Sequence, residues 1–232
     1  MTTFSNPTFT ADYQSLCNYI ATTLNRQDLT TDIPNFVSLA TSRISRDMAR
    51  IKHPSAIVRA QASITNDYAA LPIDYLAMYQ LMDQAAQYSL IYITPDQSMT
   101  IQSLGWNPDY SPVPIIPPYY SPTGTITYYT IIGDTIRMVP APDPSGTPTA
   151  LDLWYFAQLP ALSTTNTTNW ALTKYPDFYL YGALTHTAPY LKNDERIALW
   201  DGLYSRILSD IEVEADRAVR PQSKLVAARR SF

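Results

Sequence analysis

Several features that mark common classes of protein are scarce in this chain. Its 232 residues include a single cysteine, Cys17, so no internal disulfide can form and we expect a reducing compartment. No apolar run approaches the ~18 residues that span a bilayer. The first residues are rich in Thr and Asn and lack the basic and apolar blocks of a signal peptide. We therefore expect no membrane contact and a protein made in a cytoplasm.

Residues that carry chemistry are also few. With six glycines, the chain has no glycine-rich phosphate loop and no Gly-x-Ser-x-Gly turn. Its two histidines, His53 and His186, lie far apart and have no Cys, Asp or Glu at ligand spacing. Paired carboxylates stay open as an alternative, because their spacing is three-dimensional. We expect no catalytic residue, no metal and no cofactor.

Charge is sparse and unevenly placed. Charged residues make up 16% of the chain, below the roughly 25% of ordinary soluble domains. The net charge of −4 argues against general binding of nucleic acid. No Lys or Arg occurs between Arg59 and Arg137. This gap is either a chance feature of a sheet rich in Tyr, Pro and Thr, or the wall of a channel that repels DNA.

The chain is instead rich in residues suited to a core and to interfaces. The hydrophobic fraction is 46%, and there are 18 tyrosines and 19 prolines. Tyrosine buries apolar area and still offers a hydroxyl, so a tyrosine-rich surface with few charges tends to have partners.

Apolar spacing predicts helices at both ends of the chain. We expect helices over residues 11–24 and 33–51, one starting at Pro176, and one after Asn193 or Asp194 that continues to Pro221. Asp32 is expected to cap the second helix, whose other face carries Arg43, Arg46 and Arg50. This basic ridge is either solvated, paired with the acidic last helix, or a candidate subunit contact.

Shorter apolar runs predict strands in the middle. We expect them within residues 75–82, 88–93, 124–132, 135–139 and 151–156, with a short helix over 95–104. Gly133–Asp134 is expected to form a hairpin turn.

The predicted fold is α+β, a bundle of about four helices with an inserted antiparallel β-sheet or small β-sandwich. Residues 1–58 and 171–220 would form the bundle, 59–170 the insertion and 221–232 an extended tail. The tail holds Lys224, Arg229, Arg230 and Phe232 and no acid, and Arg220 directly precedes it. It is either a frayed end or a peptide that orders against a partner.

A series of short motifs occurs in a characteristic order. Early in the chain they are Asp32–Phe36, Leu39–Ala40, Arg43–Ile44, Arg46 and Leu71–Tyr75; later they are Gly133–Pro140, Leu151–Phe156, Leu159–Leu162, Thr168–Trp170, Tyr175–Leu184, Asn193–Arg196 and Trp200. Together they resemble the head-to-tail adaptor, head-completion or connector, proteins of tailed bacteriophages.

This resemblance implies a structural virion protein and not an enzyme. It implies a cyclic ring of about twelve copies at the head–tail junction, docked under the portal protein, with a tail or nozzle protein below and genomic DNA passing without sequence-specific binding. It also implies that the C-terminal tail binds the portal, which here maps to Lys224, Arg229, Arg230 and Phe232. Candidate subunit contacts are Arg43, Arg46, Arg50, Tyr128 and Tyr129.

A different class of function remains as an alternative. A carbohydrate-binding module of a phage tail component would use exposed tyrosines as stacking platforms. The candidates are Tyr119, Tyr120, Tyr128 and Tyr129, although strand propensity and subunit contacts explain them more simply.

Overall fold

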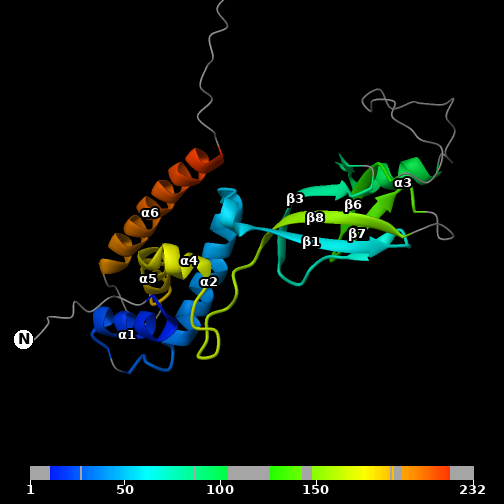
Figure 1. The fold of residues 1–232 in the computed structure, drawn as a ribbon. Helices are drawn as coiled ribbons and strands as arrows, with labels where there is room; N and C mark the ends of the chain where they lie inside the picture. Colours follow the sequence, from blue (N-terminus) through cyan, green and yellow to red (C-terminus); the bar gives the residue numbers. More distant parts are fainter. Residues whose placement is uncertain are drawn as a thin grey trace, which may run out of the picture. The chain divides into compact units, whose positions relative to one another are not determined.

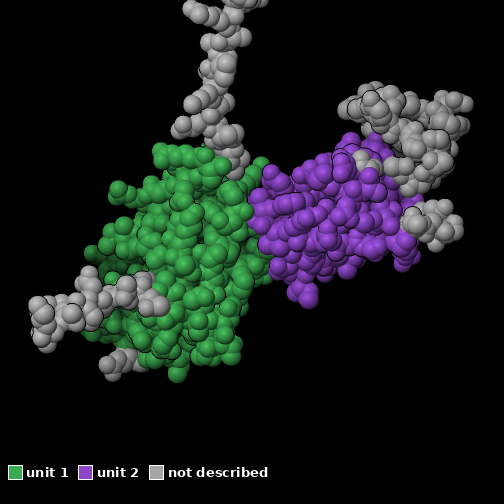
Figure 2. All heavy atoms as spheres, viewed as in Figure 1, with its two compact units in different colours: residues 1–56, 157–232 green, residues 57–156 purple. Residues whose placement is uncertain are grey.

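The computed structural model describes residues 11–26, 28–85, 87–103, 126–142, 148–188, 190 and 195–219. Within these ranges the protein has six α-helices, one short 3-10 helix and two four-stranded sheets, which confirms the predicted α+β class. The chain divides into two compact units (Figure 2). Unit 1 comprises residues 1–56 and 157–232, and unit 2 comprises residues 57–156.

Unit 1 contains the helices from both ends of the chain. They are α1 (Tyr13–Leu24), α2 (Ile33–Arg50), the 3-10 turn η1 (Pro54–Ala56), α4 (Trp170–Lys174), α5 (Pro176–Thr185) and α6 (Arg196–Val219). Asp12 caps α1, since its carboxylate accepts a hydrogen bond from the Ser15 amide at 2.7 Å. Asp32 precedes α2 but makes no side-chain cap, because its backbone is already helical and its carboxylate does not reach the first turn.

Helix α5 lies at the centre of unit 1. It packs against α1, α2, α4 and α6, and Figure 1 shows it between α2 and α6. Its buried side chains include Phe178, Tyr179, Ala183 and Leu184. Because α5 is apolar on most sides, other helices must cover it, and this requirement brings the two ends of the chain together.

Unit 2 contains eight strands and one helix. The strands are β1 (Ile57–Ile64), β2 (Tyr68–Ala70), β3 (Tyr75–Asp83), β4 (Tyr88–Ser89), β5 (Ile91–Tyr92), β6 (Tyr128–Ile132), β7 (Thr135–Val139) and β8 (Thr149–Ala157), and the helix is α3 (Pro95–Ser103). The last residue of β8 already belongs to unit 1.

The strands form two sheets with the orders β1-β8-β3-β4 and β2-β7-β6-β5 (Figure 1). Gly133 and Asp134 connect β6 and β7, and Gly133 has a φ of 60°. A positive φ at the first central position of a two-residue hairpin turn favours glycine. The predicted turn at Gly133–Asp134 is therefore confirmed. One ladder departs from the antiparallel prediction, because β5 pairs with β6 in parallel.

Side chains from both sheets fill the interior of unit 2. Along β8, Leu151, Leu153 and Tyr155 alternate with less buried residues, as expected for a strand with one buried face. Tyr155 stacks on Tyr75 of the same sheet, with ring centroids 5.9 Å apart. Burial raises the pKa of the Tyr129 hydroxyl in the second sheet, and the nearby Tyr75 raises it further.

Three elements differ from the sequence analysis. Strands β1 and β2 were not expected, because β1 is mostly exposed and lacks a clean alternation of polar and apolar residues. Helix α4 was not predicted either; Asn169 caps it by accepting from the Leu172 amide at 2.9 Å. Residues 157–170 were placed with the insertion. In the structure this segment belongs to unit 1, where the Leu159 amide donates to Ser45 Oγ at 3.1 Å.

Two helical glycines provide a matched test of this packing. A Cβ added to Gly182 would lie 3.3 Å from Tyr204 Cε2 and 3.5 Å from the Ala40 Cβ, whereas at Gly202 it would meet nothing within 4 Å. Gly202→Ala should raise the unfolding free energy by about 0.5–1 kcal/mol, through helix propensity alone. Gly182→Ala should lower it by about 1 kcal/mol, because overpacking of about 1–3 kcal/mol exceeds that gain. Urea unfolding measures both, and equal stabilisation by the two changes would contradict the packing described.

Candidate interaction surfaces

The three arginines of α2 differ in what they contact. Arg43 is half-buried; its guanidinium lies 3.1 Å from an Asp201 carboxylate oxygen on α6 and 4.0 Å from the centroid of the Tyr204 ring. Arg50 is exposed, with Nε 3.6 Å from Asp47 Oδ1, and Arg46 is exposed as well. The pairing with the last helix that we considered for this ridge therefore occurs at Arg43.

Tyr204 connects three helices of unit 1. It is 1% exposed, its ring stacks on Phe178 with centroids 4.3 Å apart, and its hydroxyl donates to Asp47 Oδ2 at 2.6 Å. Burial, followed by the hydrogen bond to Asp47, raises the pKa of the Tyr204 hydroxyl. Asp47 is thus occupied within the unit, and local spacing does not predict this bond because the partner lies 157 positions away.

A second polar chain of hydrogen bonds connects η1, α4 and α6 in unit 1. The Ser55 amide donates to His53 Nδ1 at 3.2 Å, and His53 Nε2 lies 3.2 Å from the Tyr175 hydroxyl. That hydroxyl donates to Glu214 Oε2 at 3.0 Å, and Lys174 Nζ lies 2.6 Å from Glu214 Oε1. These contacts fit one arrangement, a neutral His53 that accepts at Nδ1 and donates from Nε2.

His53 is 2% exposed and stacks on Trp170, with centroids 5.1 Å apart. Burial lowers the pKa of its imidazole below the usual 6.5; the Lys174 charge lowers it further and Glu214 opposes the shift. Every member of this chain has a partner within the unit, so the arrangement fastens η1, α4 and α6 together. The series of hydrogen bonds from His53 through Tyr175 to Glu214 therefore stabilises the packing of these elements.

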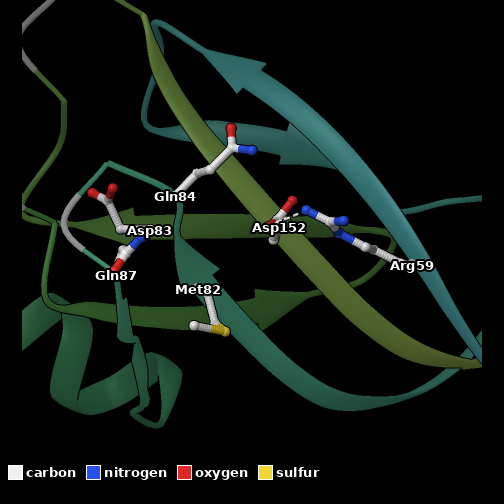
Figure 3. A pocket seen from close by; sticks show the side chains of 6 residues that line it. All are labelled: Arg59, Met82, Asp83, Gln84, Gln87 and Asp152. Atoms are coloured by element: carbon white, nitrogen blue, oxygen red, sulfur yellow. Dashed lines mark hydrogen bonds and ion pairs between the residues drawn. The ribbon is translucent and has the colours of Figure 1, made fainter.

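In unit 2 the structure places a polar hollow of about 410 Å³ beside the first sheet (Figure 3). Its lining is Arg59, Met82, Asp83, Gln84, Gln87 and Asp152. Asp152 accepts from Arg59 at 2.6 Å and from Gln61 at 2.9 Å, and these two bonds lower the pKa of its carboxyl. The central charges of the hollow are thus already paired with each other.

Two of the candidate contact tyrosines lie in the interior. Tyr128 and Tyr129 are 2% and 6% exposed, and Tyr128 clusters with Ile93 and Val139. A ring this buried offers no face on which a sugar can stack. Two of the four tyrosines considered for carbohydrate binding therefore cannot serve as stacking platforms. Tyr119 and Tyr120 lie outside the described residues.

The remaining predicted site residues can be placed only in part. Lys224, Arg229, Arg230 and Phe232 lie outside the described residues, as do Asn193, Asp194, Arg220 and Pro221. Within the described ranges, no three His, Cys, Asp or Glu side chains gather closely enough to hold a metal ion. The described helices also include none with the length and apolar character needed to cross a membrane.

Fold and surfaces together define a class. This is an α+β protein whose helical unit is built from both ends of the chain and is interrupted by a β-rich unit. A family model described as SU10 adaptor protein matches residues 11–225, which is most of the chain. The chain belongs to the SU10 adaptor protein family, a family of phage adaptors. No curated protein matches it.

Membership in this family makes the protein a structural, non-enzymatic component of a phage virion that assembles with other virion components. The resemblance seen in the sequence motifs is thereby confirmed at the level of a phage adaptor.

The buried His53 and the partly buried His186 predict how stability depends on pH. Burial lowers the pKa of His53 and of His186, and Arg43 and Arg46 add to the effect at His186. As the pH falls, these histidines therefore take up protons more readily in the unfolded chain than in the folded chain. The unfolding free energy is greatest above about pH 6.5 and decreases as the pH drops below it. Urea unfolding from about pH 7.5 to about pH 5.5 should show this decrease.

A His53→Gln variant should have a shallower pH dependence, and His53→Gln combined with His186→Gln the shallowest. The control is an exposed change such as Asn25→Gly, which should leave the slope unchanged. A double variant with the wild-type slope would show that these imidazoles are not held neutral.

Proposed function

We propose that this chain is a head–tail connector that forms a ring under the portal of a tailed bacteriophage. The observation that carries the proposal is the family match over residues 11–225. Copies related by a rotation about one axis would make head-to-tail contacts and close into a ring, for which we propose twelve copies. The ring would assemble in the host cytoplasm, complete the head and occupy the head–tail junction of the virion.

The ring would connect the portal to a tail or nozzle protein and line the channel through which genomic DNA passes. Support comes from the charge pattern of unit 2, in which the strands from β2 to β6 carry no Lys or Arg. A wall of this kind leaves phosphates without cationic partners, so DNA would pass without being held. No sequence-specific contact with DNA is proposed.

Portal binding is proposed for the C-terminal tail, residues 221–232. Lys224, Arg229 and Arg230 would pair with carboxylates, and Phe232 would fill an apolar pocket. The segment contains no acid, so an acidic groove on the portal is the complementary surface.

Deletion of residues 221–232 tests this assignment. The truncated chain should fold as the full chain does and bind the portal of the same phage at least about tenfold more weakly, because its charged and aromatic anchors are gone. Arg229→Glu with Arg230→Glu, and separately Phe232→Ala, should each give part of the loss. Affinity can be measured by biolayer interferometry with immobilised portal.

A chain carrying the same twelve residues in shuffled order is the matched control, since it keeps the charge but not the spacing of the anchors. Unchanged affinity after truncation would refute the tail assignment. Failure of the full chain to bind portal or to form rings in its presence would refute the connector function itself.

A further inference from the structure

Strand β1 forms one outer edge of the first sheet of unit 2. The sheet has the order β1-β8-β3-β4, and Figure 1 shows β1 on one side of β8 and β3 on the other. All eight residues of β1 pair with β8. Among the described residues, no strand pairs with the opposite side of β1. An edge of this length presents backbone groups that a further strand can bind.

The hydrogen bonds of β8 show which backbone groups of β1 point outward. The Ala150 carbonyl accepts from the Gln84 amide at 2.9 Å, so Ala150 directs its backbone groups toward β3. These directions alternate along a strand, so the odd-numbered residues of β8 point toward β1, where their partners are the even-numbered residues. The other residues of β1 direct their N–H and C=O groups away from the sheet: Ile57, Arg59, Gln61 and Ser63.

The devices that usually protect an exposed edge are missing from β1. The strand contains no proline, glycine or lysine. Its one charged residue is Arg59, whose guanidinium donates to Asp152 of β8 at 2.6 Å and so stays on its own sheet. Val58 is 41% exposed, and Ala60 and Ala62 are not buried, although all three lie on the face that β8 buries. A neighbouring strand would bind the backbone and also cover these apolar side chains.

Strand β3 has an open edge on the opposite side of the same sheet. The short strand β4 pairs with only its last two residues. The Leu81 carbonyl accepts from the Leu90 amide at 2.8 Å on that side, so the odd-numbered residues of β3 direct their backbone groups outward. Ahead of Leu81 these residues include Ala77 and Tyr79, and Tyr79 is 53% exposed. One copy therefore carries two different edges that can each bind a strand.

The two edges run in the same direction. Strand β1 is antiparallel to β8. Strand β3 is antiparallel to β8 as well, because Gln84 bonds Ala150 at one end of the pair and the Tyr155 hydroxyl donates to Asp74 at the other. A ring of twelve copies turns each neighbour by about 30°, so β1 of one copy and β3 of the next stay nearly parallel. Adjacent strands of a sheet are themselves rotated by about 20–25°, so a continuous sheet accommodates this turn.

We propose that β1 of one copy of this chain pairs in parallel with β3 of the next copy, so that the first sheet continues from copy to copy. The contact joins two different edges and therefore repeats head to tail. No like charges meet across it, because β3 contains no Lys or Arg. The inference rests on the proposed ring and names the surfaces that join its copies.

Hydrogen exchange at single amides tests the pairing. In the unassembled chain, the amides of Arg59 and Ser63 should exchange fast, whereas the amide of Ala60, which is bonded to β8, should exchange slowly. In rings assembled with portal, the two outward amides should slow at least about tenfold, and so should those of Ala77 and Tyr79. Mass spectrometry with electron-transfer fragmentation resolves these positions.

Proline substitution gives an independent readout. Ser63→Pro removes an outward N–H and leaves the bonds to β8 in place, so it should reduce ring formation at least about tenfold while the chain still unfolds cooperatively in urea. Ala77→Pro should do the same from the other edge. Ser63→Thr and Ala77→Thr keep the N–H groups and are the matched controls, which should form rings normally. Mass photometry and negative-stain electron microscopy, with and without portal, count the rings.

The outcomes separate this inference from the proposed function. Outward β1 amides that stay fast in wild-type rings, or folded proline variants that form rings normally, would overturn the pairing alone. Slow β1 amides together with fast amides at Ala77 and Tyr79 would assign the β1 edge to portal or to a second β1 strand, and would also overturn it. A wild type that forms no rings even with portal would overturn the connector function, and the inference with it.

Discussion

Unit 1 depends on the close approach of α5 to α2 and α6. Gly182 suits this approach, because a Cβ there would lie only 3.3 Å from Tyr204 Cε2. Tyr204 then stacks on Phe178 and bonds Asp47, which links the three helices through one ring and one hydroxyl. The contact joins parts of the chain separated by the whole of unit 2, so it holds the helical unit together across the insertion.

The polar residues of unit 1 serve the same end. His53, Tyr175, Glu214 and Lys174 form a directed series of hydrogen bonds in which each buried group has a partner. A neutral histidine suits this place because a charged one would lose its hydration on burial. The polar side chains of this unit thus stabilise the packing of its helices. The side chains that remain exposed are the ones that other chains can contact, as a phage adaptor requires.

Much of the fold follows from local patterns in the sequence. The apolar stripes of α1, α2, α5 and α6, the turn at Gly133–Asp134 and the alternation along β8 depend on neighbouring residues, and they could be predicted. Strand β1 could not, since its exposed edge position removes the alternation. The hydrogen-bond partners of Asp47 and His53 could not be predicted either, because each bond joins residues more than a hundred positions apart in the sequence. The burial of Tyr128 depends on packing within unit 2, which composition does not reveal.

The pairing of β1 with β8 has a further consequence. Ile57 lies directly opposite Phe156, so the chain leaves the helical unit and returns to it at nearly one point. Opposed residues of an antiparallel pair are about 5 Å apart, a gap that a tight turn closes. Unit 2 is therefore joined to the helical unit through two paired strand ends, and the distance between its two points of attachment does not depend on how many residues unit 2 contains.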